Sequence, residues 1–240
     1  MLRYLFFMVL LSLGVVFYVQ SKETSINENA RWEYLSAEGV MQRIVKVDDY
    51  WVETHFEQEN SAFIRTFGGK WSVSEDSLIV EIHFDSNDST QVGNSNAYEL
   101  KILEDGSIEL NGITYEYLQS ENESKLVGAW FINGRMRDGE LQSREFRERR
   151  TLKILSESSF QWVAYHVGTG VFSGSGGGLY ETTDDGKYIE KIQFFSRDSS
   201  RVGAELSFDY EIKEGIWHHQ GLSSRGQPIY ETWARFPDQW

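Results

Sequence analysis

The chain has no cysteine and only two prolines among its 240 residues. The absence of cysteine excludes disulfide bonds, thiolate metal sites, cysteine nucleophiles and a lipid-modified cysteine after a leader segment. Basic residues are also scarce, because 23 lysines and arginines stand against 37 acids and the formal net charge is −14. A molecule with a net negative charge repels phosphate backbones and anionic lipid headgroups, so we expect no nucleic-acid partner.

Long apolar runs are equally rare, and the one that occurs lies at the N-terminus. Arg3 precedes an uncharged stretch over residues 5–19, which is typical of a signal sequence and short for a membrane-spanning helix. We interpret residues 1–21 as a signal peptide or a membrane anchor, and the polar residues 22–30 as a linker. The protein is therefore expected to be exported: periplasmic, secreted, or attached to a membrane through this segment only.

The rest of the chain contains an internal repeat. At an offset of 110 residues, the stretch 78–93 matches 188–203. Weaker matches join Gly68-Gly69 to Gly177-Gly178 after one gap, Tyr50 to Phe160, and Tyr115-Glu116 to Tyr230-Glu231. A repeat of this length is far above solenoid periods and indicates domain duplication. We therefore expect two domains, residues 31–120 and residues 124–236.

Each copy has the periodicity of β-strands. Apolar Leu78, Val80, Ile82 and Phe84 alternate with the residues between them, as in a strand with one buried face. Turn signals separate about eight or nine such runs in each copy, and 15% aromatic content suffices for two cores. The expected fold class is all-β: two tandem antiparallel β-barrels after an N-terminal signal or anchor helix, with β-sandwiches as the alternative.

Residues 135–150 are the main candidate for a helix, because they are rich in charges of both signs. Gly139 interrupts the segment and no apolar stripe at helical spacing runs through it. We predict a long polar hairpin loop that runs into a strand carrying Phe146, Leu152 and Ile154. This segment is about a dozen residues longer than its equivalent in the first copy.

The ends of the second copy carry a family resemblance. It opens with Leu126-Val-Gly-Ala-Trp130, a G-x-W motif, and it closes with a strand that ends at Arg235. This resembles lipocalins and calycins, in which a tryptophan near the closed end of the barrel packs against a basic residue of the last strand. Arg31-Trp32 holds the same place in the first copy without the glycine, and no arginine closes that copy.

Together with the strand count and the stretch 194–203, these residues make the chain similar to lipocalin-like secreted or membrane-anchored proteins of unknown function common in Bacteroidetes, here in two tandem copies. The resemblance implies small barrels, each with an internal pocket, and it carries over no catalytic residue.

Motifs for metal, phosphate or acid chemistry are weak. Adjacent His218 and His219 point to opposite faces of a strand, and no zinc-type spacing accompanies His219, so we expect no metal and no cofactor. The glycine run 174–178 lacks a following helix and favours a hairpin or a close backbone approach over a phosphate cradle. Asp88 and Asp198 each stand in a Ser-x-Asp-Ser context, which predicts turns that hydrogen-bond their own backbone.

The candidate ligand site is the interior of the second copy. Where the first copy has Val52, Phe56, Val80 and Tyr98, the second has Trp162, His166, Glu190 and Phe208 on the faces that we predict to be interior, so polar groups replace apolar ones at 166 and 190. The site residues are Trp162, His166, Glu190, Phe208, Tyr210 and His219. A buried Glu190 or His166 needs a polar partner. The two side chains contact each other, they contact a ligand, or the predicted strand register is wrong by one residue and they are not buried.

These observations favour an exported, non-enzymatic module that binds a small apolar or amphipathic ligand in the second barrel. The alternative is a structural or protein-interaction pair of domains in the cell envelope, without a small ligand. A hydrolase ranks below both, because no motif pairs a nucleophile with a base.

Overall fold

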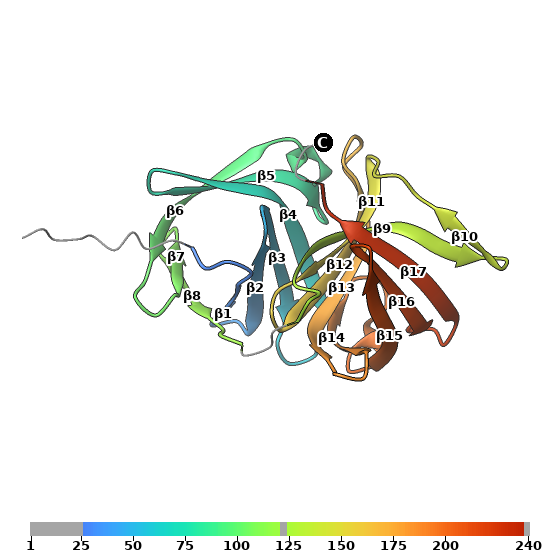
Figure 1. Cartoon of the computed structure of the whole chain (residues 1–240). Helices are drawn as coiled ribbons and strands as arrows, with labels where there is room; N and C mark the ends of the chain where they lie inside the picture. Colours follow the sequence, from blue (N-terminus) through green and yellow to red (C-terminus); the bar gives the residue numbers. More distant parts are fainter. Residues whose placement is uncertain (1–25, 121–123, 238–240) are drawn as a thin grey trace, which may run out of the picture.

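A computed structural model describes residues 26–120 and 124–237, and it confirms the all-β expectation with two eight-stranded antiparallel barrels in tandem (Figure 1). The β-sandwich alternative is wrong, because the first and last strands of each copy pair and close the sheet. The segment interpreted as a signal or anchor, residues 1–21, lies outside the described residues. Within the described ranges no helix is long and apolar enough to cross a membrane.

The first barrel is a simple meander in which each strand pairs with the next. Its strands are β1 (Arg31–Leu35), β2 (Val40–Val47), β3 (Tyr50–Glu57), β4 (Phe63–Ser74), β5 (Ser77–Asp85), β6 (Ser95–Ile102), β7 (Ile108–Leu110) and β8 (Ile113–Tyr117). Trp32 and Trp51 stack in its core, with ring centroids 5.9 Å apart. Ile26 and Ala30, which the sequence assigned to the linker, are also buried in this core, so residues 26–30 belong to the barrel.

The second barrel repeats the meander and adds one hairpin. Its strands are β9 (Gly128–Arg137), β10 (Glu140–Ser143), β11 (Arg149–Leu155), β12 (Ser159–His166), β13 (Val171–Thr182), β14 (Lys187–Phe195), β15 (Glu205–Lys213), β16 (Ile216–Leu222) and β17 (Pro228–Arg235). β10 pairs only with β9, and the two project from the barrel as the predicted hairpin (Figure 1). Phe146, predicted to lie in a strand, is instead in the loop before β11.

A glycine pair in each barrel lets the sheet bend sharply. A Cβ atom on Gly69 would collide with the backbone carbonyl of Glu81, and one on Gly178 would collide with that of Lys191. The run 174–178 is therefore part of β13, where it allows the close backbone approach that the sequence indicated. Two further shared elements are short 3-10 helices, η1 (Ser89–Gln91) and η2 (Ser199–Arg201), each capped by the preceding aspartate as predicted.

A β-bulge opposite each glycine pair changes which face the following residue occupies. In β5 the register shifts between Ile82 and Phe84, so Leu78, Val80 and Ile82 face the core of the first barrel and Phe84 does not. A bulge inserts one residue and reverses the alternation beyond it. The sequence alternation that grouped Phe84 with Ile82 was therefore wrong at this position.

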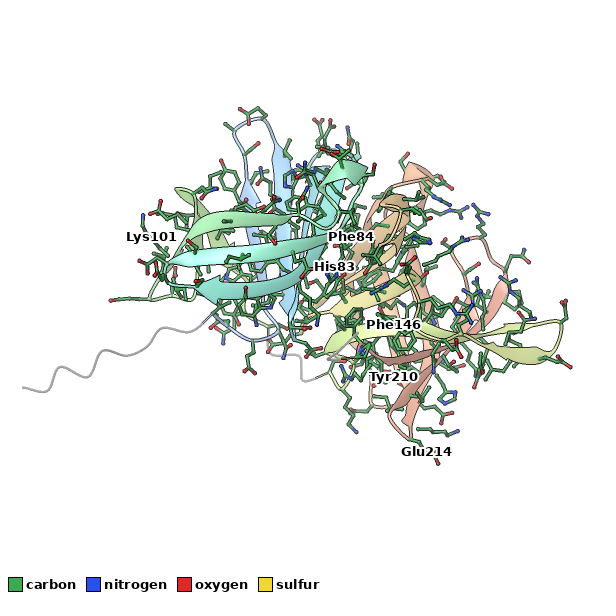
Figure 2. All side chains as sticks on the ribbon, turned by 90° about the horizontal axis from the view of Figure 1, so that it is seen from above. His83, Phe84, Lys101, Phe146, Tyr210 and Glu214 are labelled. Atoms are coloured by element: carbon green, nitrogen blue, oxygen red, sulfur yellow. The ribbon has the colours of Figure 1, made fainter. Side chains whose placement is uncertain are left out.

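Phe84 belongs to a third core, which lies between the barrels. Its buried members come from both copies: Val45, Val47, Tyr50, Val52, Phe84, Ala129, Leu152, Ile154, Val163, Tyr165 and Phe236. Figure 2 shows His83 and Phe84 on the side of the first barrel that meets the second, with Lys101 on the far side. β2, β3, β11 and β12 are consequently buried on both faces, and the two barrels pack as one body.

A polar network at the same interface fixes how the barrels meet. The amide of Gln161 accepts a hydrogen bond from Thr54 Oγ1 at 2.8 Å and donates to Thr66 Oγ1 at 2.9 Å and Ser175 Oγ at 3.0 Å. All four side chains are buried. Buried polar groups that are fully paired specify one arrangement, because any displacement leaves a donor or acceptor without a partner.

Two tyrosines and a histidine form a second buried chain across the interface. The hydroxyls of Tyr50 and Tyr165 are 2.8 Å apart, and Tyr50 Oη lies 3.2 Å from His83 Nδ1. Burial, with the nearby charges of Arg150 and Lys70, lowers the pKa of His83 to about 3. Burial also raises the pKa of Tyr165 to about 12. His83 is therefore neutral in the folded protein at neutral and mildly acidic pH.

The pKa of His83 predicts acid sensitivity. An unfolded histidine binds a proton below about pH 6.5, whereas folded His83 does so only near pH 3. Stability is therefore expected to fall as the pH drops from about 6.5 toward 3, with a contribution of up to about 1.4 kcal/mol per pH unit from this residue. His83→Gln should flatten the pH dependence measured by urea unfolding, whereas Tyr50→Phe should shift stability equally at each pH. Parallel curves for wild type and His83→Gln would contradict this assignment.

Candidate functional site

A cavity of about 260 Å³ lies at one end of the second barrel, where β14 ends, β15 begins and β16 turns into β17. Its apolar wall consists of Trp162, Ile192, Phe195, Leu206, Phe208 and Trp233. Trp162 and Phe195 meet edge to face, with ring centroids 5.4 Å apart. The cavity therefore combines an aromatic rim with the interior of a barrel.

A buried ion pair forms one part of the polar lining. Lys153 Nζ on β11 lies 2.7 Å from Glu190 Oε1 on β14, and both side chains are almost completely buried. Aromatic rings surround the ammonium group, with the ring centroids of Tyr188 at 4.9 Å, Trp217 at 5.0 Å and Trp233 at 5.2 Å. Cation–π attraction and the carboxylate together offset the cost of removing this charge from water.

A second polar group approaches the cavity from β16 and β17. His219 Nδ1 lies 3.7 Å from Glu231 Oε2, and Arg135 pairs with Glu231 Oε1 at 3.0 Å. Burial, followed by the charge of Lys153, lowers the pKa of His219. Burial alone would raise the pKa of Glu231, but contacts with His219 and Arg135 lower it overall. We therefore read Glu231 as an anion and His219 as a neutral ring beside it.

Two buried indole N–H groups near the cavity lack hydrogen-bond partners. Trp233 lines the cavity, and its ring centroid is 5.9 Å from that of Trp217. Neither Nε1 has an acceptor among residues 26–120 and 124–237. An unpaired buried donor costs roughly 1–3 kcal/mol. A ligand oxygen that reached Trp233 would recover that cost.

Four of the six sequence-predicted site residues line this one cavity: Trp162, Glu190, Phe208 and His219. Tyr210 instead lines a separate cleft with Asp185, Asp209 and His218. His166 lies half-exposed at the end of β12, with Nε2 3.9 Å from Glu148. Glu190 and His166 therefore do not meet, and the partner of Glu190 is Lys153.

Strand registers show which residues of the two barrels are equivalent. Val52 pairs with Gly68 as Gln161 pairs with Gly177, so Val52 corresponds to Gln161 and not to Trp162. The constant offset of 110 fails here because the hairpin from Gly178 to Ile192 is one residue longer than the equivalent hairpin from Gly69 to Ile82. Val52 and Phe56 lie at the inter-barrel interface, where Phe56 stacks on Phe194, and they are not interior as predicted.

With this register, the polar residues of the second barrel replace apolar residues of the first. The positions of Lys153, Glu190, His219 and Glu231 are occupied in the first barrel by Ile44, Val80, Leu110 and Ile113. In the same register Trp233 corresponds to Tyr115, so the sequence match of Tyr115-Glu116 with Tyr230-Glu231 was wrong. At the three of these positions that are buried in the first barrel, Ile44, Val80 and Leu110, an apolar contact is thus replaced by the Lys153–Glu190 ion pair and by His219.

Sequence reasoning missed Lys153, Glu231 and Trp233. Lys153 stands between Leu152 and Ile154, so a rule of apolar-inward alternation assigns the lysine to the outside. Leu152 and Ile154 are indeed buried, but against the first barrel, and Lys153 therefore faces inward. One feature of the sequence could have indicated the inward orientation of Lys153. The neighbouring strand β12 is apolar along most of its length, which is typical of a strand that is covered on both faces.

The opposite end of the second barrel carries the contact that the G-x-W motif implied. The Arg235 guanidinium stacks 3.9 Å from the Trp130 ring centroid, and its Nη1 donates to the Val127 carbonyl at 2.7 Å. A Cβ atom on Gly128 would collide with Arg235, which explains the glycine of the motif. In the first barrel Tyr117 takes the place of Arg235 beside Trp32.

Comparisons with known proteins give no family. No family model matches the chain, and no curated protein matches it. Among the residues that the structure describes, no group of three His, Asp or Glu side chains is placed to hold a metal ion. What the site can do must therefore be argued from its own geometry.

The Lys153–Glu190 pair gives a direct test of this interior. Lys153→Ile alone leaves a carboxylate buried without its partner and is expected to cost roughly 3–5 kcal/mol of stability. Adding Glu190→Val reproduces the equivalent pair of the first barrel, Ile44 and Val80, and should recover most of that loss. Urea unfolding of both single variants and the double variant completes a double-mutant cycle. Additive losses, with no recovery in the double variant, would refute the coupling.

Proposed function

We propose that the protein is an exported, non-enzymatic module that binds a small amphipathic ligand in the cavity of the second barrel. The observation that carries this proposal is the contrast between the barrels. The first fills three equivalent interior positions with the buried aliphatic residues Ile44, Val80 and Leu110, whereas the second has Lys153, Glu190 and His219 there, and these three line the cavity. Buried charges cost stability relative to apolar packing, and a ligand site is a reason to keep them.

The size and lining of the cavity support a small ligand with one apolar and one polar part. A volume of about 260 Å³ is slightly below the usual range of roughly 300–1,000 Å³ for ligand pockets. Trp162 and Phe195 offer an aromatic clamp at the rim. The Trp233 N–H offers a donor, and the Arg135–Glu231 pair offers a charged anchor in the same cavity.

The proposed localisation and the proposed family resemblance of the protein rest mainly on its sequence. The segment 1–21 supports export, either with cleavage or as an anchor. The lipocalin-like resemblance is supported by two closed barrels and by the Trp130–Arg235 contact. Proteins of that shape commonly use the barrel interior as a binding site.

The alternative, a structural or protein-interaction role in the envelope, is favoured by the inter-barrel core. The buried Gln161 network and the Tyr50–Tyr165 contact join the barrels into one body. Such a unit could serve as a rigid spacer without any small ligand. A binding experiment on the cavity separates the two proposals.

Trp162→Ala should weaken binding of the neutral fluorescent amphiphile N-phenylnaphthylamine by about tenfold or more, because a large aromatic wall is lost. The control is Trp71→Ala, which removes a half-buried tryptophan from the first barrel and should leave the dye affinity unchanged. Fluorescence titration gives both affinities, and circular dichroism confirms folding. Equal affinity in wild type and folded Trp162→Ala, or no dye binding to wild type, would count against the cavity as the site.

A further inference from the structure

Positive charge gathers on one segment of this acidic chain. Residues 135–150 contain six arginines against four acids, although the whole chain carries a net charge of −14. The segment spans the end of β9, the β10 hairpin and the start of β11. The first barrel has no counterpart, since its β1–β2 connection is a short turn after Leu35. The cluster therefore belongs to the second barrel only.

A cavity of about 380 Å³ lies beneath this segment, at the end of the second barrel where β9 ends and β11 begins. Its lining includes Arg137, Arg144, Arg149 and Arg150, together with Phe146 and Tyr165. Phe146 packs edge to face on Phe131 of β9, with ring centroids 5.0 Å apart, and Figure 2 shows it close to that strand. The cavity thus has an aromatic floor and a wall of guanidinium groups.

Three of these arginines have no carboxylate to neutralise them. Among the described residues no acid lies within ion-pair distance of Arg137, Arg144 or Arg149, whereas Arg135 pairs with Glu231 and Arg147 pairs with Glu145. The one acid that lines the cavity, Glu145, is thus the partner of Arg147. Burial, together with the charges of Arg137 and Arg135, lowers the pKa of Arg144. Like charges held this close repel one another unless an anion lies between them.

Arg150 gives the cavity a fixed positive charge at its base. Its side chain is buried, its guanidinium stacks 4.2 Å from the Phe146 ring centroid, and its Nε donates to the Arg147 carbonyl at 2.9 Å. Planar guanidinium groups bind phosphate, sulfate and carboxylate through paired hydrogen bonds. A fixed arginine below and three unneutralised ones above provide such an arrangement.

We propose that this arginine cavity binds the oxyanion group, phosphate, sulfate or carboxylate, of a small molecule. The site adjoins the cavity of the second barrel, because Ile132, Arg144 and Thr151 line both. It stands independently of the proposed function, since it needs only the arginines and the space between them.

Isothermal titration of the full chain with inorganic sulfate, inorganic phosphate and glucuronate, at constant ionic strength, tests the site. One saturable site per chain is expected, weakened tenfold or more by Arg144→Gln and by Arg149→Gln. Arg147→Gln is the matched control, because it removes the same charge from the same segment without lining the cavity. Binding of the inorganic anions would show that the oxyanion group alone is sufficient for binding. Binding of glucuronate alone would show that the aromatic floor is also required. Both results support the proposal.

The proposal is overturned by three results. Equal losses of anion affinity in Arg144→Gln and Arg147→Gln would show that the anions respond only to the overall positive charge of the segment. If none of the three anions binds saturably, the arginine cavity is not an oxyanion site. Binding to anionic phospholipid vesicles in the absence of binding to free anions would assign a membrane-facing surface instead. Neutral-dye binding in the barrel is unaffected by any of these outcomes, so the two proposals can fail separately.

Discussion

The rest of the structure depends on the burial of one face of each barrel against the other. β2, β3, β11 and β12 each place one row of side chains in their own barrel and the other row in the shared core around Tyr50, Phe84 and Tyr165. Because the outer faces of these strands are also buried and largely apolar, the inner faces do not have to provide all of the hydrophobic burial. That freedom allows Lys153 to point into a barrel while Leu152 and Ile154 point out of it.

The two barrels show how a duplicated fold can diverge while its frame is kept. Both retain the glycine pair, the bulge opposite it and the aspartate-capped 3-10 turn, because these set the bend and closure of the sheet. The interiors differ at three equivalent positions, where the first barrel has Ile44, Val80 and Leu110 and the second has Lys153, Glu190 and His219. A body with three cores can tolerate a less stable interior in one barrel, since the other two stabilise the whole.

Much of the fold could be predicted from the sequence, because alternation, turn residues and the internal repeat are local signals. The Trp130–Arg235 contact followed from a motif. The failures have physical causes that one sequence does not display. A bulge places Phe84 on the other face, and a hairpin longer by one residue makes Gln161, not Trp162, the equivalent of Val52. The first barrel covers the outer face of β11, so Leu152 and Ile154 are buried against it and Lys153 faces inward. The cavity residues that were predicted, such as Glu190 and Phe208, lie where the alternation is uninterrupted, because Glu190 precedes the bulge of β14 and Phe208 lies on β15.

We propose that the second barrel holds a small molecule that the first does not. Native mass spectrometry of the full chain, purified from its own cells, is the most direct test. We expect a mass excess that corresponds to one small amphipathic molecule per chain and that is released when the protein is denatured. A native mass equal to that of the polypeptide alone, in a preparation that is folded and also fails to take up the neutral dye, would contradict the claim and leave the structural role.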